Sequence, residues 1–173
     1  THFIESESPY VVRTNNPLSG LGVAVGKTLT IDPGVIVKFD NGAQFIPSGK
    51  VIAHGTLEKP IIFTSIYDDA AGGDTNGDGN ASIPFVTAWS RILLSNNELN
   101  EFEFVDVRYG NQCFNISGPT ATVIRKSLIE KCSVGLDISF YDSGLTLEEN
   151  TIKDNGIGIY LFLVSQVGNF IKH

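Results

Sequence analysis

The chain has 173 residues, of which 42% are apolar and 18% are charged, with 18 glycines. This length and composition are typical of one ordered, turn-rich domain spanning 1–173. The formal charge of −7 and the isoelectric point near 4.8 exclude a phosphate-binding surface, so we expect no nucleic-acid partner. No run approaches the ~18 apolar residues of a membrane-spanning helix, so we also expect no membrane insertion.

Short segments rich in β-branched and aromatic residues follow one another along the chain and predict strands. Stretches with a helical spacing of apolar residues are nearly absent. Gly, Asn, Asp, Ser or Pro separates the segments, as is usual at strand ends. The sequence therefore predicts an all-β chain with strands at 28–31, 35–39, 60–64, 91–94, 101–107, 122–129, 135–138, 145–152 and 158–163.

The segment 29–65 reads LTIDPGVIVKFDNGAQFIPSGKVIAHGTLEKPIIFTS. Its landmarks are a strand pair of the form LTI-PG-VKF, a turn that ends in GT, and a PI-FTS strand. In these features it resembles secreted and surface-anchored bacterial right-handed parallel β-helix proteins, which share a pectate-lyase-like β-solenoid architecture. The resemblance implies that fold and an extracellular location. It implies no activity, because the fold carries lyases, hydrolases, adhesins and plain scaffolds alike.

The resemblance extends to one long loop insertion at about 66–89, which is acidic and Gly-rich and ends at Trp89. Members of the group often carry such an insertion after the FTS strand. The sequence AWSRI at 88–92 departs from the group, which usually has an acidic residue or Gly beside the Trp. The packing of that end of the loop therefore does not follow from the resemblance.

The insertion contains DTNGDG at 74–79, with oxygen-bearing side chains on alternate positions as in a calcium loop. The twelfth position of a complete calcium loop is a bidentate Glu, whereas Phe85 stands there in this chain. We therefore predict a structural Ca²⁺ site that recruits the nearest further acids, with the ligand set Asp74, Asn76, Asp78, Asp68 and Asp69. The alternative is that Gly, Asp and Asn gather here only because turns favour them.

The second half of the chain repeats every 22 to 23 residues, with Val107, Ile129 and Ile152 as anchors. Each anchor is followed six residues later by Cys or Gly, and then by an apolar, variable, apolar triplet. Such a repeat is what one turn of a β-solenoid requires. We predict roughly seven turns, stacked about 4.8 Å apart with the anchors in one column. A β-sandwich is the alternative, but it would not hold one pattern over three passes.

Two polar columns accompany the anchors. Two positions before each anchor stand turn residues that could hydrogen-bond from one turn to the next: Ser127, Asn150 and Asn169. One position after the anchors the charge alternates, which favours attraction between neighbouring turns: Arg108, Glu130 and Lys153. Such exposed pairs contribute about 0–1 kcal/mol each, so they help alignment without explaining stability.

Candidate catalytic groups are few. Asp106 and Arg108 could act together as a ligand and a base, but no second column of carboxylates converges on them. His2, His54 and His173 are scattered and lack metal-ligand spacing. We therefore predict that the protein is not an enzyme and has no catalytic residues.

Cys113 and Cys132 are too few to form the disulfide framework of a small secreted domain. We expect both to be small buried core residues, and the sequence leaves open whether they are bonded. The chain contains no Met, so we expect Thr1 to be a processed or truncated start. This start fits export to the cell surface or medium, although a cloned fragment would begin in the same way.

The chain ends in VGNFIKH, where Asn169 and Ile171 begin a further repeat. The end of a solenoid exposes unpaired backbone groups along an open edge. Two explanations stay open: the chain is a piece of a longer solenoid, or the strand-like segment 10–14 of one subunit pairs with 168–173 of the next in a head-to-tail filament.

Together these observations predict a non-catalytic extracellular structural protein, a β-solenoid scaffold at a surface or in a matrix that self-associates end to end. The alternative is a carbohydrate-binding or carbohydrate-cleaving domain, either a lyase or a hydrolase, with glycans as its partners.

Overall fold

The computed structural model describes residues 1–14, 20–79, 81–118, 121–140 and 144–163. These residues form eighteen strands and one short 3₁₀ turn, η1 (Glu5–Glu7). In this part of the chain, no helix has the length and apolar character needed to span a bilayer.

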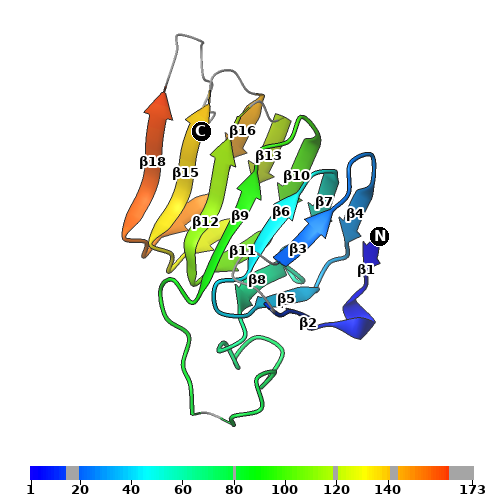
Figure 1. Ribbon diagram of the computed structural model, residues 1–173, viewed down its shortest axis with the longest axis vertical. Coiled ribbons are helices and arrows are strands. Elements are labelled where there is room, and N and C mark those ends of the chain that lie inside the picture. Colours follow the sequence, from blue (N-terminus) through cyan, green and yellow to red (C-terminus); the bar gives the residue numbers. More distant parts are fainter. Residues whose placement is uncertain (15–19, 80, 119–120, 141–143, 164–173) are drawn as a thin grey trace.

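The chain visits three parallel sheets in rotation, so that every third strand belongs to the same sheet (Figure 1). The first sheet contains β1 (His2–Phe3), β4 (Thr28–Ile31), β7 (Lys50–His54), β10 (Leu99–Glu103), β13 (Ala121–Arg125) and β16 (Leu145–Glu148). The second contains β2 (Tyr10–Val12), β5 (Ile36–Phe39), β8 (Ile61–Ser65), β11 (Val105–Arg108), β14 (Leu128–Glu130) and β17 (Thr151–Lys153). The third contains β3 (Gly20–Val23), β6 (Gln44–Pro47), β9 (Trp89–Leu94), β12 (Gly110–Ser117), β15 (Val134–Phe140) and β18 (Ile157–Leu163). This topology confirms the predicted parallel β-helix.

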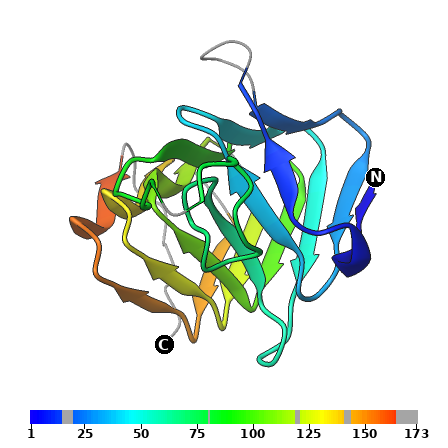
Figure 2. The ribbon, with the colours of Figure 1, turned by 90° about the horizontal axis from the view of Figure 1, so that it is seen from below.

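Corresponding residues of successive turns lie side by side. Val107 pairs with Ile129, and Ile129 pairs with Ile152, so the three anchors form one column as predicted. In Figure 2 the colours run through the stack in sequence order, so each turn packs on the turns that come just before and just after it in the chain. The described residues form six turns, whereas roughly seven were predicted, because residues 66–88 use roughly the length of one turn without adding a strand to any sheet.

Two corners of the last three turns pass through residues with left-handed backbone. Between the first and second sheets φ is 48°, 51° and 53°, at Phe104, Lys126 and Glu149 respectively. Between the second and third sheets φ lies between 54° and 66°, at Tyr109, Lys131 and Asp154. Such a conformation costs a non-Gly residue on the order of 1–3 kcal/mol and persists only where the surrounding structure imposes it. The first set of corners divides each of three segments predicted as single strands into two strands: 101–107, 122–129 and 145–152.

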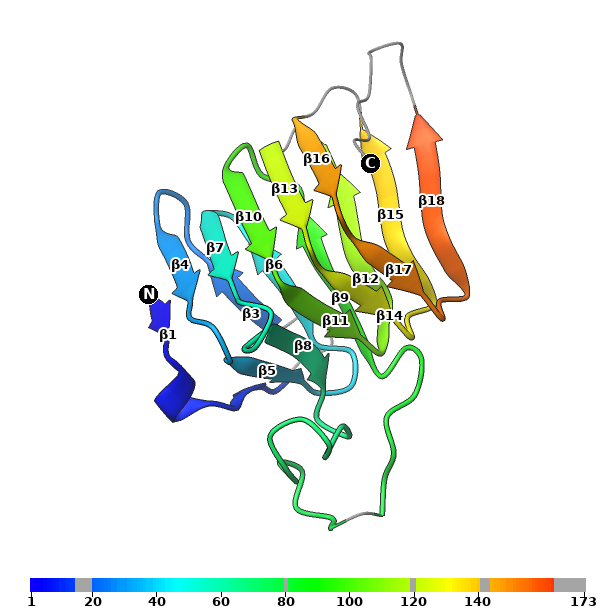
Figure 3. The ribbon, with the colours of Figure 1, turned by 180° about the vertical axis from the view of Figure 1, so that it is seen from behind.

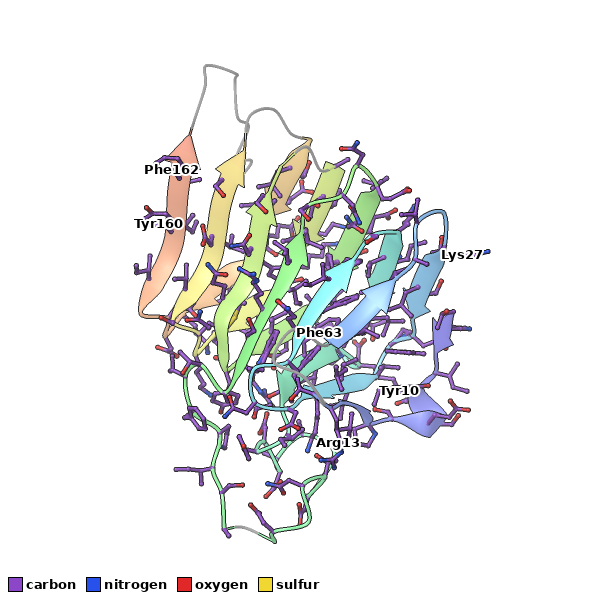
Figure 4. All side chains as sticks on the ribbon, viewed as in Figure 1. Tyr10, Arg13, Lys27, Phe63, Tyr160 and Phe162 are labelled. Atoms are coloured by element: carbon purple, nitrogen blue, oxygen red, sulfur yellow. A yellow bond between two sulfur atoms is a disulfide. The ribbon has the colours of Figure 1, made fainter. Side chains whose placement is uncertain are left out.

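A series of fully buried phenylalanine rings lies along the interior. The ring centroids of Phe45 and Phe63 are 6.3 Å apart, and Phe102 lies 6.3 Å from Phe63 and 5.1 Å from Phe114. Phe63 is labelled among these side chains in Figure 4. Full burial of one such side chain contributes about 1.5–3 kcal/mol, so the stacked inward side chains are the main source of stability.

The predicted polar turn column is present where the structure describes it. The Oδ1 atom of Asn150 accepts the N–H of Ser127 at 3.0 Å, and its Nδ2 donates to the carbonyl of Ile124 at 2.7 Å. The Oγ atom of Ser127 in turn accepts the N–H of Val105 at 3.2 Å. The bonds to Ser127 and Val105 satisfy backbone N–H groups next to the corner, and the bond to Ile124 ties the Asn150 side chain to the preceding turn. Asn169, the third predicted member, lies outside the described residues.

Cys113 and Cys132 form a disulfide, with Cα atoms 5.8 Å apart. Both residues are fully buried, as predicted, so the bond settles the question that the sequence left open. Cys113 lies in β12, and Cys132 lies at the corner before β15, one turn further along the stack. The disulfide therefore joins two consecutive turns.

Candidate functional site

The loop 66–88 leaves the end of β8 and returns at Trp89, the first residue of β9. Figures 1 and 3 show it projecting beyond the three sheets at one edge of the stack. Arg13 Nη2 donates to the carbonyl of Thr75 at 3.1 Å, and Lys38 Nζ donates to the carbonyl of Gly73. The first half of the loop is therefore attached to the first two turns of the second sheet. The predicted position of the insertion is confirmed.

Three of the predicted calcium ligands meet inside this loop. Asp69, Asp74 and Asp78 each offer a carboxylate oxygen, and these oxygens lie within 4.8 Å of one another. Hydrogen bonds within the loop hold Asp74 in place: its Oδ2 accepts the N–H of Gly79 at 2.8 Å, and its Oδ1 accepts that of Gly77 at 2.7 Å. These bonds, led by that from Gly79, lower the pKa of Asp74 and so favour its charged form.

Asn76, the fourth predicted ligand, lies beside the three acids. Its Nδ2 donates to Asp78 Oδ2 and to Ser82 Oγ, both at 2.9 Å. Its Oδ1 is buried, as is Oδ1 of Asp69, and neither atom has a hydrogen-bond partner within the described chain. Two buried oxygens without donors, next to three gathered carboxylates, are a donor set that suits a hard cation such as Ca²⁺.

Asp68, the fifth predicted ligand, is not part of this group. Its Oδ2 accepts hydrogen bonds from Thr64 Oγ1 at 2.7 Å and from Arg108 Nε at 2.9 Å, and Arg108 Nη2 lies 2.8 Å away. The Asp68 side chain is only 4% exposed. Its role is therefore to neutralise an arginine of the second sheet and to fix the start of the loop on that sheet.

Arg108 also binds Asp106, which stands two residues before it on β11, with Nη1 and Oδ2 2.7 Å apart. Burial is the main cause that raises the pKa of Asp106, and Arg108 partly offsets it. Burial also disfavours the charge of Arg108, but Asp106 and Asp68 outweigh burial and raise the pKa of the guanidinium. The pair considered as a catalytic candidate is thus the centre of an ion network between sheet and loop.

The predicted alternation of charge in the outward column is present in part. Glu130 Oε2 lies 3.3 Å from Nζ of Lys153 in the next turn, and Glu130 Oε1 lies 3.2 Å from Nζ of the adjacent Lys131. Arg108, although it pairs with Glu130 in the sheet register, turns instead to the two aspartates. Two carboxylates, Asp68 and Asp106, compensate the guanidinium of Arg108, while Glu130 is neutralised by the two lysines.

Sequence reasoning missed Lys38, which is fully buried beneath the loop. Burial lowers the pKa of its ammonium group, and the charges of Asp69, Asp68 and Asp74 partly offset this effect. A lysine in the predicted strand 35–39 was the available signal, because a charged side chain between apolar neighbours on a strand needs either solvent or a partner. The loop provides that partner.

The two histidines among the described residues have different partners. His2 Nε2 lies 2.6 Å from Asp32 Oδ1, and His54 Nε2 lies 3.2 Å from Glu101 Oε2. His173 lies outside the described residues. Within the described chain, Asp69, Asp74 and Asp78 form the one group of three or more acids, histidines or cysteines close enough to share an ion.

The last described strand, β18, lies at the end of the stack and leaves inward-facing side chains uncovered. Ile159 is 41% exposed and Leu161 is 48% exposed, whereas their partners in β15, Leu136 and Ile138, are 0% and 1% exposed. Figure 4 shows the outward-facing Tyr160 and Phe162 on the same strand.

Comparisons of the chain with protein-family models, with curated proteins and with solved structures find no match.

Proposed function

We propose that the protein is a non-catalytic extracellular scaffold that self-associates end to end through the open turns of its solenoid. The observation that carries this proposal is the exposed inward face of β18, where Ile159 and Leu161 continue an apolar column that is fully buried one turn earlier. Within the described residues no strand follows β18 in its sheet, and exposed apolar side chains on such an edge favour the addition of another strand.

The sheet topology supports a head-to-tail contact. Each sheet begins with one of the first three strands, β1 to β3, and ends with one of the last three, β16 to β18. All neighbours within a sheet are parallel, so a second copy translated along the stack would continue all three sheets at once. Such a contact does not close on itself and generates a filament. Of the predicted pairing segments, 10–14 includes the end strand β2, whereas 168–173 lies outside the described residues.

Two adjacent side chains of equal exposure provide a sharp test. Leu161 and Tyr160 are both 48% exposed, but Leu161 faces inward and Tyr160 faces outward. We expect Leu161→Lys to abolish assembly, because a charge would have to be buried between two turns, and Tyr160→Lys to leave it unchanged. Sedimentation and negative-stain microscopy at increasing concentration measure the outcome. Dispersed wild-type monomers at high concentration would refute the proposal.

An extracellular location is supported by the Cys113–Cys132 disulfide, because such bonds persist mainly in oxidising compartments. It is also supported by the resemblance of 29–65 to secreted and surface-anchored bacterial β-helix proteins. Isolation of the native protein under thiol-trapping conditions tests this point. Free thiols at both positions would argue for a reducing compartment.

The proposed lack of catalysis is supported by the ion pairs that occupy two outward-facing carboxylates of the second sheet. Asp106 is bound to Arg108, and Glu130 is bound to Lys131 and Lys153. Sugar cleavage needs an acid and a base, or a nucleophile, that are free to face the substrate. A panel of polysaccharides with product detection by reducing ends and by unsaturated sugars checks this reading, and turnover would favour the carbohydrate-cleaving alternative.

We further propose that Asp69, Asp74, Asp78 and Asn76 bind a structural Ca²⁺ that holds the loop together. The two buried oxygens without partners on Asp69 and Asn76 support this site. A ligand that binds only the folded state stabilises it by about 2.7 kcal/mol at one hundred times its Kd, so added Ca²⁺ should raise the melting temperature and EDTA should lower it.

Two aspartate variants separate binding from packing. Asp74→Asn should eliminate the Ca²⁺-induced shift in melting temperature, because it weakens the central carboxylate of the group. Asp68→Asn should lower the melting temperature with and without Ca²⁺ and keep the shift, because Asp68 binds Arg108 instead. A wild-type melting temperature that Ca²⁺ and EDTA both leave unchanged would exclude the site.

A further inference from the structure

Asn followed directly by Gly occurs at three places in the described chain: 41–42, 76–77 and 155–156. We propose that Asn41 is a site of spontaneous deamidation and isomerisation in the folded protein, and that the fold protects the other two asparagines. The three sites share one sequence, so the difference between them rests on structure alone.

The reaction is intramolecular until its last step. The backbone nitrogen of the Gly loses its proton and attacks Cγ of the Asn side chain. The new N–Cγ bond forms while the Cγ–Nδ2 bond breaks, and ammonia leaves with the proton. Water then opens the resulting succinimide at one of its two carbonyls, which yields either Asp or isoaspartate. The reaction therefore requires a Gly nitrogen that can lose its proton and an Asn side chain that can turn toward it.

Both requirements are met at Asn41. Asn41 is exposed at the turn between β5 and β6, and within the described part of the chain no residue accepts the N–H of Gly42. One backbone bond closes the turn, from the N–H of Ala43 to the carbonyl of Asp40 at 2.9 Å. Gly42 has φ of 76°, a conformation that is common for Gly in such turns. Rotation of Asn41 therefore disturbs few contacts.

Asn76 meets neither requirement. The N–H of Gly77 donates to Asp74 Oδ1 at 2.7 Å, which holds its proton in a charge-assisted hydrogen bond. The side-chain amide of Asn76 donates to Asp78 and Ser82 at 2.9 Å. Attack on Cγ would require all of these bonds to break.

Hydrogen bonds also hold Asn155 and the N–H of Gly156, but here the partners are backbone groups of the preceding turn. Its Oδ1 accepts the N–H of Cys132 at 2.9 Å, and its Nδ2 donates to the carbonyl of Ile129 at 3.0 Å. The N–H of Gly156 donates to the carbonyl of Cys132 at 3.0 Å. Asn155 thus forms a bridge between two turns, and its side chain becomes free only when the turn opens.

Conversion of Asn41 places a second carboxylate beside Asp40, and isoaspartate also adds a methylene group to the backbone of the turn. Asn41 is part of the contact between the first two turns, because its carbonyl accepts Thr14 Oγ1 at 3.4 Å. We therefore expect modification to loosen this N-terminal corner while the core of the stack stays intact.

Incubation of the folded protein at physiological temperature and mildly alkaline pH, followed by peptide mapping, tests the proposal. Mass spectrometry detects deamidation, and an isoaspartyl methyltransferase labels isoaspartate. We expect Asn41 to react at least about tenfold faster than Asn76 or Asn155, a factor that corresponds to about 1.4 kcal/mol of protection. In urea the three sites should react at similar rates.

Two matched variants complete the test. Asn41→Gln should remove the isoaspartate signal of the folded protein, because the larger ring that Gln would form closes far more slowly, and Asn76→Gln should leave the signal unchanged. Equal rates at the three sites in the folded protein would overturn the proposal. So would an unmodified Asn41 in the folded protein when the same site reacts in urea.

Discussion

The ion network around Arg108 leads to a quantitative prediction about stability. In an Arg108→Met variant, the aliphatic part of the side chain is largely retained but the charge is lost. Asp68 and Asp106 then remain buried without their common counter-charge. Removal of one partner from a buried pair costs about 3–5 kcal/mol, because the remaining charge is desolvated and uncompensated. We expect the free energy of unfolding to fall by this amount at neutral pH.

The loss should depend on pH with a definite sign. Burial already raises the pKa of Asp106, and in the variant no guanidinium opposes that effect. An acid whose pKa is raised by folding favours the folded state at low pH, and this contribution is lost as the pH rises through the raised pKa. The deficit of Arg108→Met relative to the wild type should therefore shrink as the pH is lowered from neutral toward 5.

Arg125 provides a matched control. Arg125 Nη2 lies 2.8 Å from Glu103 Oε2, the same distance as between Arg108 Nη2 and Asp68 Oδ2. The two arginines differ in burial, because the Arg125 side chain is 40% exposed and that of Arg108 is 17% exposed. Because Arg125 is exposed and Glu103 keeps Lys126 at 3.6 Å as a second partner, Arg125→Met should cost only about 0–1 kcal/mol. Urea unfolding of both variants at neutral and acidic pH measures the difference. Equal losses in the two variants, or a deficit of Arg108→Met that does not change with pH, would refute the reasoning.

Three further variants test other parts of the stack by urea unfolding. Replacement of both Cys113 and Cys132 by Ala should cost about 3 kcal/mol, because a bond across 19 residues lowers the entropy of the unfolded chain by about this amount. An unchanged urea midpoint would contradict this. Asn150→Ala should cost about 1–3 kcal/mol, because it removes the acceptor of the Ser127 N–H and the bond to the Ile124 carbonyl, and a neutral effect would show that water replaces the side chain. Burial opposes the charge of Glu101, but Lys50 and His54 outweigh burial and lower the pKa of Glu101. The Glu101 carboxylate therefore stabilises the fold above its ordinary pKa, and this contribution is lost as the pH falls through the lowered pKa. Glu101→Gln should therefore flatten the acid side of the stability profile, and an identical profile would be the contrary result.

The repeat could be predicted because inward positions accept few residue types. Val107, Ile129 and Ile152 face a dry interior, so their apolar character recurs once per turn and is visible in the sequence. The corners left no such signal. Phe104 and Lys126 adopt left-handed φ although neither is a typical turn residue, because the strands on both sides fix the path of the chain.

The loop was predicted in position and in part of its chemistry. The alternate spacing of Asp74, Asn76 and Asp78 already indicated that their side chains could converge, since alternate positions of a tight loop share a side. The role of Asp68 could not be predicted, because its partner Arg108 is 40 residues away and belongs to the next turn of the second sheet. Contacts of that range depend on how turns stack, which the local sequence around an acid does not reveal.

The position of the 66–88 insertion has a consequence for protein engineering. It enters and leaves the stack at a corner between the second and third sheets, where other turns cross with only a few residues, such as Tyr109 between β11 and β12. The stack continues past the insertion, because β8 pairs with both β5 and β11, and β9 pairs with both β6 and β12. We therefore expect this corner to accept a foreign peptide or a small folded cargo, displayed sideways from a stack whose strand pairing stays as it is.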